Sequence, residues 1–125
     1  MTRKAFGKKN PNLPFHPAVR AGDFIFISGQ VPKDENGNMF SGTIEEETKR
    51  CIEAVQRALK EAGADLQDVV KATVFLEDAR DFGRYNGVFA KYFPDGMLAR
   101  TTVEARAVIS TKIEIDAIAY KPESK

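Results

Sequence analysis

Residues 112–120 read KIEIDAIAY, and this stretch alternates apolar and polar side chains with the period of a β-strand. One face of such a strand carries only apolar side chains, those of Ile113, Ile115, Ala117 and Ala119. The opposite face carries Glu114, Asp116 and Ile118. The stretch therefore predicts a sheet with one face packed on a core. On the other face, two carboxylates must meet either solvent or a polar site.

The chain upstream of this strand alternates between the period of a strand and that of a helix. The expected elements are strands at 23–27, 71–76 and 101–108, helices at 43–63 and 81–93, and one helical turn at 65–69. Their order predicts an α/β two-layer sandwich, with a mixed β-sheet and two helices on one face. Because the other face of such a sheet is bare and half apolar, the sequence also predicts self-association.

The longer helix has clear signals at both ends. Thr43 and Glu46 have the spacing of a capping box, and Gly63 provides a left-handed C-terminal stop. Cys51 falls on the apolar stripe between these ends. We therefore expect a buried thiol that packs as a small hydrophobic side chain rather than a reactive one.

Length and composition indicate a single domain spanning 1–125. The 19 basic and 18 acidic residues leave a formal net charge of +1, so no overall field favours nucleic acid or anionic lipid. A single cysteine excludes an intrachain disulfide and is consistent with a reducing compartment. The sequence has neither an apolar signal region nor an apolar run near the ~20 residues that span a bilayer. We therefore expect a cytoplasmic protein with no membrane partner.

The inventory of reactive side chains excludes several kinds of site. His16 is the only histidine, so one chain cannot build a metal site from three histidines, and no metal site is expected. A Ser-His-acid arrangement would have to use His16, which lies between Phe15 and Pro17, where packing or solvent exposure is the simpler interpretation. Neither of the common glycine-rich phosphate-binding loops is present.

A cluster of charges lies on the last two predicted strands. Arg100 could hold a carboxylate through two parallel hydrogen bonds, and Glu114 could orient or deprotonate a water molecule. The alternative is an ordinary ion pair between Arg106 and Glu114, across an antiparallel hairpin that turns at 109–111. In that register Arg100 lies ~20 Å along the strand from the partner of Glu114. A site that uses both residues therefore predicts an oligomer.

Several segments together resemble the RidA family, also called YjgF/YER057c/UK114. The C-terminal resemblance is carried by LARTTVE at 98–104 and KIEIDAIA at 112–119. The rest is carried by PFHPAVRAGD at 14–23, ISGQ at 27–30, VKATVFL at 70–76, and Asp81, Phe82, Tyr85 and Asn86. These motifs span nearly the whole chain.

The resemblance implies a chorismate-mutase-like α/β fold assembled as a homotrimer, with clefts between subunits. It also implies hydrolysis of reactive 2-imino acids, in exchange with enamines, that PLP-dependent dehydratases release from serine or threonine. Examples are 2-iminobutanoate and 2-iminopropanoate, and the products are 2-oxo acids and ammonia. Because such an imine is already electrophilic, the protein mainly needs to orient the reactants. No metal or organic cofactor is expected.

By position, the resemblance assigns three residues to catalysis. Arg100 would bind the substrate carboxylate, Glu114 would position or activate the attacking water, and Thr102 would help to hold that water. The resemblance further implies that the substrate is contacted by Ser28, Gly29, Asn86, Phe15 and Phe82.

Other functions stay open at this point. Within the enzyme class, an unsaturated dicarboxylate such as 2-aminomuconate is an alternative substrate. Family members have also been described as endoribonucleases and translation inhibitors, but the near-neutral charge and the lack of a basic aromatic groove weigh against strong RNA binding. The third alternative is a non-catalytic trimeric ligand-binding or chaperone-like protein, in which Arg100 holds a 2-oxo acid without turnover.

Overall fold

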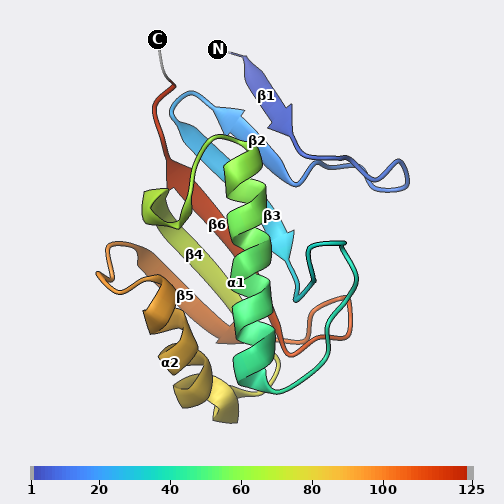
Figure 1. Ribbon diagram of the computed structural model, residues 1–125, viewed down its shortest axis with the longest axis vertical. Coiled ribbons are helices and arrows are strands. Elements are labelled where there is room, and N and C mark those ends of the chain that lie inside the picture. The colour runs from blue at the N-terminus through green and yellow to red at the C-terminus, as the bar shows by residue number, and fades with distance from the viewer. Residues whose placement is uncertain (1, 124–125) are drawn as a thin grey trace.

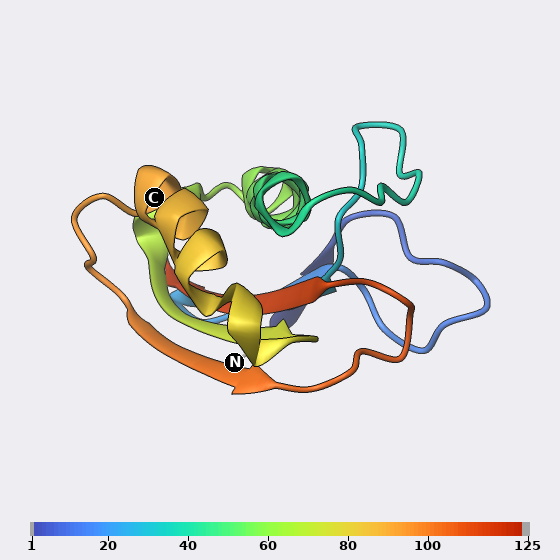
Figure 2. The same ribbon diagram turned by 90° about the horizontal axis from the view of Figure 1, so that it is seen from below.

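The computed structural model describes residues 2–123, which form a mixed sheet with two helices packed on one face (Figures 1 and 2). The strands are β1 (Arg3–Phe6), β2 (Ala18–Ala21), β3 (Phe24–Gln30), β4 (Val69–Leu76), β5 (Ala99–Glu104) and β6 (Ile113–Tyr120). The helices are α1 (Ile44–Glu61) and α2 (Phe82–Tyr92), with the short 3-10 helices η1 (Leu66–Asp68) and η2 (Ala79–Asp81). The predicted α/β class, with two helices on one face of the sheet, is confirmed.

The six strands lie in the order β1-β2-β3-β6-β4-β5. Strands β4 and β5 run parallel, and all the other neighbours run antiparallel. The parallel pair follows from the connection through α2, because a crossover helix returns the chain to the same end of the sheet. The sheet is therefore mixed, as predicted.

Helix α1 begins and ends where the sequence predicts. The Thr43 hydroxyl accepts from the Glu46 amide and the Glu46 carboxylate accepts from the Thr43 amide, which completes the capping box. Gly63 ends the helix with φ +87°, a conformation that glycine adopts without strain. Cys51 is fully buried and its thiol donates to the Gln30 carbonyl at 3.1 Å. Burial raises the pKa of this thiol far above its usual range, which agrees with the predicted inert core role.

The predicted C-terminal hairpin is wrong. Strand β5 pairs with β4, and β4 lies between β5 and β6. The residue opposite Glu114 is therefore Phe75 of β4 rather than Arg106, and the described salt bridges include no Arg106–Glu114 pair. The segment 105–112 is longer than a hairpin turn and carries the chain across the end of β4 (Figure 1).

Strands β1 and β2 were not predicted from the sequence. Both are only four residues long, and they include the charged residues Arg3, Lys4 and Arg20. Short, charged strands at the edge of a sheet show little apolar alternation, because one side of the edge strand faces solvent rather than a neighbour.

The two faces of the sheet differ in their side chains. Buried apolar residues of the three central strands point toward α1 and α2; they are Ile25, Ile27, Ala72, Val74, Leu76, Ile113, Ile115, Ala117 and Ala119. The helix-free face alternates with them and contains Phe24, Phe26, Tyr120, Val103, Glu114 and Asp116. The apolar stripe predicted on β6 is therefore buried, and the two carboxylates do lie on the other face.

Candidate active site

A cavity of about 590 Å³ lies beside the Glu114 carboxylate at the start of β6. Its polar part is formed by Lys8, Asn10, Ser28, Gly29, Gln30, Lys33 and Glu114. Apolar side chains of Leu13, Phe15, Val108 and Ile109 contribute the rest of the wall together with Pro17 and Val31. Four of the predicted site residues, Phe15, Ser28, Gly29 and Glu114, are thus brought together.

Gly29 approaches Glu114 so closely that any side chain at its position would displace the Glu114 carboxylate. A Cβ atom built on Gly29 would overlap the Glu114 carboxylate and lie 3.0 Å from its Cδ carbon. The pairing of β3 with β6 shifts register between Ile27 and Gln30, which displaces the backbone at this point. The preceding Ser28 is anchored by its hydroxyl, which donates to the His16 carbonyl at 2.7 Å. The irregular end of β3 therefore leaves space in which the Glu114 carboxylate lies against the Gly29 backbone.

Glu114 has the electrostatics of a proton-handling group. Partial burial raises the pKa of its carboxyl above the ordinary value, and the negative charge of Asp116 raises it further. Both effects disfavour the ionised form. A carboxyl whose pKa is raised in this way can exchange protons with a bound water closer to neutral pH.

Arg100 lies on the opposite side of the sheet and packs on α2. Its guanidinium carbon is 4.8 Å from the ring centroid of Phe89, 5.0 Å from that of Tyr85 and 5.8 Å from that of Phe82. Such contacts hold the flat cation by its face and leave its N–H edges available for a carboxylate. Arg100 and Asn86 also line one shallow hollow of about 270 Å³. The second group of predicted residues is therefore Arg100, Asn86 and Phe82.

Thr102 belongs to this second group through a residue that the sequence interpretation assigned only to packing. The hydroxyls of Thr102 and Tyr85 share a hydrogen bond of 2.7 Å. Tyr85 is fully buried, and burial raises the pKa of its phenol, so its hydroxyl keeps its proton. Tyr85 therefore contacts both Arg100 and Thr102. In the sequence, Tyr85 is one of several aromatic residues at helical spacing, and nothing there distinguishes a residue that contacts Arg100 and Thr102 from one that only packs in the core.

One chain does not bring the two groups together. Arg100 lies opposite Ala72 on β4 and points to the helix side, whereas Glu114 lies opposite Phe75 and points to the helix-free side. Along β4 the offset is three residues, or ~10 Å, and two strand spacings add about 10 Å across the sheet. The predicted separation of ~20 Å rested on the wrong hairpin, but the two residues do lie apart within one chain, because the sheet itself stands between them.

Among residues 2–123, no group of three or more His, Cys, Asp and Glu side chains is placed to hold a metal ion. No helix within the same range combines the length and the apolar character needed to cross a membrane.

Comparisons with known proteins now bear on this geometry. The family model described as Endoribonuclease L-PSP matches residues 7–121. The chain belongs to this family, the RidA (YjgF/YER057c/UK114) family. The resemblance drawn from the sequence motifs is confirmed.

Relatives of this RidA family chain cover most of its length. It is 47% identical over 113 residues to a RutC family protein of Pyrococcus abyssi, with 89% of each chain covered. It is 37% identical over 108 residues to Reactive Intermediate Deaminase A, chloroplastic, of Arabidopsis thaliana, which covers 85% of this chain and 58% of that protein. Because that relative is chloroplastic, the cytoplasmic location expected for this chain stays a prediction.

The fold matches solved structures of the RidA family. The crystal structure of E. coli TdcF with bound serine superposes with a TM-score of 0.84 at 26% identity, covering 94% of this chain and 98% of that chain. TdcF thus binds a small amino acid within the same fold.

Proposed function

We propose that this chain hydrolyses small 2-imino acids, in exchange with their enamines, to 2-oxo acids and ammonia. The observation that carries the proposal is the pair of half-sites. One presents an arginine whose face is held by aromatic rings, and the other presents a glutamate with a raised pKa beside a cavity. The name of the Arabidopsis relative, Reactive Intermediate Deaminase A, supports the same chemistry.

The active unit in this proposal is a homotrimer with each site shared by two subunits. Arg100 of one subunit and Glu114 of the next would meet across the interface, because within one chain the sheet separates them. The helix-free face supports this assembly. Its side chains Phe24, Phe26, Tyr120 and Val103 are between 40% and 46% exposed, and a partner subunit would remove this apolar surface from water.

In the proposed reaction, the Arg100 guanidinium grips the substrate carboxylate through two N–H donors. Glu114 orients a water and accepts its proton as the water oxygen attacks the imine carbon. That attack forms a carbon–oxygen bond, moves the π electrons of the C=N bond to nitrogen, and gives a tetrahedral amino alcohol. Glu114 returns the proton to nitrogen, the new hydroxyl group gives up its own proton to the Glu114 carboxylate, and its electrons form the carbonyl bond as the carbon–nitrogen bond breaks, which releases ammonia and leaves the 2-oxo acid.

The other site residues position the reactants in this proposal. Ser28 and the Gly29 amide face the Glu114 half of the cleft, and Phe15 forms part of its apolar wall. Thr102 would hold the water with its hydroxyl, which Tyr85 fixes. Asn86 and Phe82 would border the carboxylate end of the substrate, beside Arg100.

The proposal predicts the outcome of a coupled assay. A threonine or serine dehydratase would release the imine, and its decay would be followed with wild type, Arg100→Ala and Glu114→Gln. Wild type should accelerate the decay. Arg100→Ala should lose most of kcat/KM because the carboxylate clamp is gone, and Glu114→Gln should lower kcat by about 100-fold or more, since general-base catalysis typically contributes 10²–10⁴-fold.

The same preparations separate the alternatives. Binding of 2-oxobutanoate without any turnover would identify a ligand-binding protein, turnover of 2-aminomuconate alone would identify the dicarboxylate deaminase, and cleavage of RNA would identify the ribonuclease that the family description names. Absence of acceleration by folded protein on both dehydratase products would contradict the proposed substrate class.

A further inference from the structure

Glu47 is a buried carboxylate near the N-terminal end of α1. It is only 2% exposed, whereas its neighbours Glu45 and Glu46 are exposed. A glutamate is rarely buried to this extent unless its charge is compensated by specific partners. The position of Glu47 in the first turns of a helix favours its charge through the helix dipole, as it does for the other two. Of these three glutamates only Glu47 is buried, which indicates that its carboxylate makes specific contacts inside the protein.

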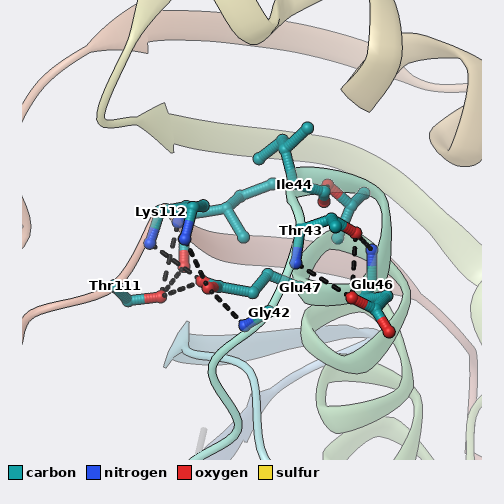
Figure 3. A network of polar contacts seen from close by, with 9 residues as sticks. Gly42, Thr43, Ile44, Glu46, Glu47, Thr111 and Lys112 are labelled. Atoms are coloured by element: carbon teal, nitrogen blue, oxygen red, sulfur yellow. Dashed lines mark hydrogen bonds and ion pairs between the residues drawn. The ribbon is translucent and has the colours of Figure 1, made fainter.

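Four donors surround the Glu47 carboxylate (Figure 3). Its Oε1 accepts from the Lys112 amide at 2.9 Å and from the Thr111 hydroxyl at 3.2 Å, and that hydroxyl shares its proton with the Ile113 carbonyl at 3.1 Å. Its Oε2 accepts from the Gly42 amide at 3.1 Å and from the Lys112 ammonium at 3.3 Å. Each oxygen thus accepts twice. A glutamine amide at this position could accept with its oxygen from two of these donors, but its NH2 group would face the other two donors and could not accept from them.

The residues held by Glu47 lie next to the cavity that contains Glu114. Thr111 and Lys112 end the segment 105–112, and Glu114 follows two residues after Lys112 on β6. The same segment contributes Val108 and Ile109 to the cavity wall. On its far side, the Lys112 carbonyl accepts from the Glu77 amide at 3.0 Å, which fixes the segment to the end of β4.

We infer that Glu47 is a positioning residue, which anchors the segment 105–112 and the start of β6 and thereby fixes both the Glu114 carboxylate and the apolar cavity wall. The catalytic part of this inference rests on the proposed deaminase function. Arg100 lies on β5 and packs against Tyr85 of α2, outside the anchored segment. Loss of the Glu47 carboxylate should therefore impair the step that Glu114 performs more than the binding of the substrate carboxylate.

The test compares Glu47→Gln, Thr111→Val and the matched control Glu45→Gln. The control removes the same charge from the same end of α1 at an exposed position with no hydrogen bond among the described residues. Amide hydrogen exchange of peptides covering 105–113 measures the anchor directly. Steady-state kinetics on the dehydratase-derived imine measure kcat and KM separately, because a general loss of structure would alter both.

For Glu47→Gln we expect at least tenfold faster exchange in 105–113 and a kcat lowered about tenfold or more, because a 1 Å misplacement can cost ~100-fold in rate. KM should stay within about twofold, since the Arg100 clamp is untouched. Thr111→Val, which removes one of the four donors, should change the same quantities in the same direction by less. Glu45→Gln should change none of them.

Unchanged exchange in 105–113 would overturn the inference whatever the activity. So would faster exchange with kcat and KM both equal to wild type, or a loss confined to KM. If Glu47→Gln does not fold, the hydrogen exchange in 105–113 and the kcat and KM values of Thr111→Val decide whether the inference stands. If wild type does not turn over the imine, the proposed function fails, and hydrogen exchange alone decides whether Glu47 anchors the segment.

Discussion

Gly29 and Glu114 lie in close contact beside the cavity. The carboxylate occupies the space that a Cβ at Gly29 would need, so glycine lets the carboxylate keep this position and is not needed here for an unusual φ. The same contact limits the solvation of the carboxylate. Together with the charge of Asp116, this burial keeps the pKa of Glu114 above its ordinary value.

The raised pKa of Glu114 predicts the acid limb of the pH profile. Because the ionised form must accept the proton of water, kcat/KM should fall as the pH drops through this pKa, at a higher pH than for an ordinary glutamate. Asp116→Asn removes a negative charge next to Glu114. It should therefore lower the pKa of Glu114 and move the limb to lower pH, which pH-dependent kcat/KM values would measure.

Asp23→Asn is the control for this prediction, since Asp23 is an exposed carboxylate on the turn before β3 and has no part in the cavity. The acid limb of the kcat/KM profile of Asp23→Asn should coincide with that of wild type. A limb that moves to higher pH in Asp116→Asn, or does not move, would show that another group controls the profile.

How far the sequence predicts the site depends on the type of residue. Arg100 and Glu114 are candidates from the sequence itself, as charged residues at the last two predicted strands, whereas Ser28 and Gly29 become candidates only through the resemblance to the RidA family. The contributions of Tyr85 and Glu47 could not be identified before the structure. An aromatic residue at helical spacing and a glutamate near a helix N-terminus are also what packing and the helix dipole favour, and only the three-dimensional contacts separate these roles.

The strands near the C-terminus show which properties of an element can be predicted locally. The position of β6 follows from alternation within KIEIDAIAY, and the start of α1 follows from its capping box. The partner of β5 does not, because pairing depends on where the crossover through α2 returns the chain. Because β5 and β6 are neighbours in sequence, a hairpin between them was the simplest prediction. In the structure β5 instead pairs in parallel with β4.

The capping box of α1 gives a prediction about stability. Thr43→Ala removes the hydroxyl that accepts from the Glu46 amide at 3.2 Å. An alanine at an N-cap typically costs about 1 kcal/mol, so the free energy of unfolding should fall by about that amount. Urea unfolding at one fixed protein concentration would measure it, since the stability of an oligomer depends on concentration.

Ser41→Ala provides the matched control, because Ser41 is exposed two residues before the cap and makes no hydrogen bond among the described residues. Its unfolding curve should overlay that of wild type. Equal loss of stability in both variants would mean that the Thr43 hydroxyl contributes nothing specific to the helix.

The complete fold divides the proposed active site into two halves. Helices cover one face of the sheet (Figure 2). Aromatic side chains of α2 pack against Arg100 on that face, while the other face carries Glu114 and exposes apolar side chains. A face of this kind is most stable when another copy covers it. The proposed symmetric assembly accounts for both features. Another copy would cover the bare face, and each subunit would contribute Arg100 to one site and Glu114 to another.

Complementation between inactive subunits tests this shared site most directly. Arg100→Ala and Glu114→Gln chains with different tags would be co-expressed, and the imine deaminase activity of the purified mixed oligomer would be compared with each variant alone. In each mixed trimer, about one interface in three combines the intact Arg100 of a Glu114→Gln chain with the intact Glu114 of an Arg100→Ala chain, so about a third of wild-type activity should return. Activity no higher than the average of the two variants would contradict a site built between subunits.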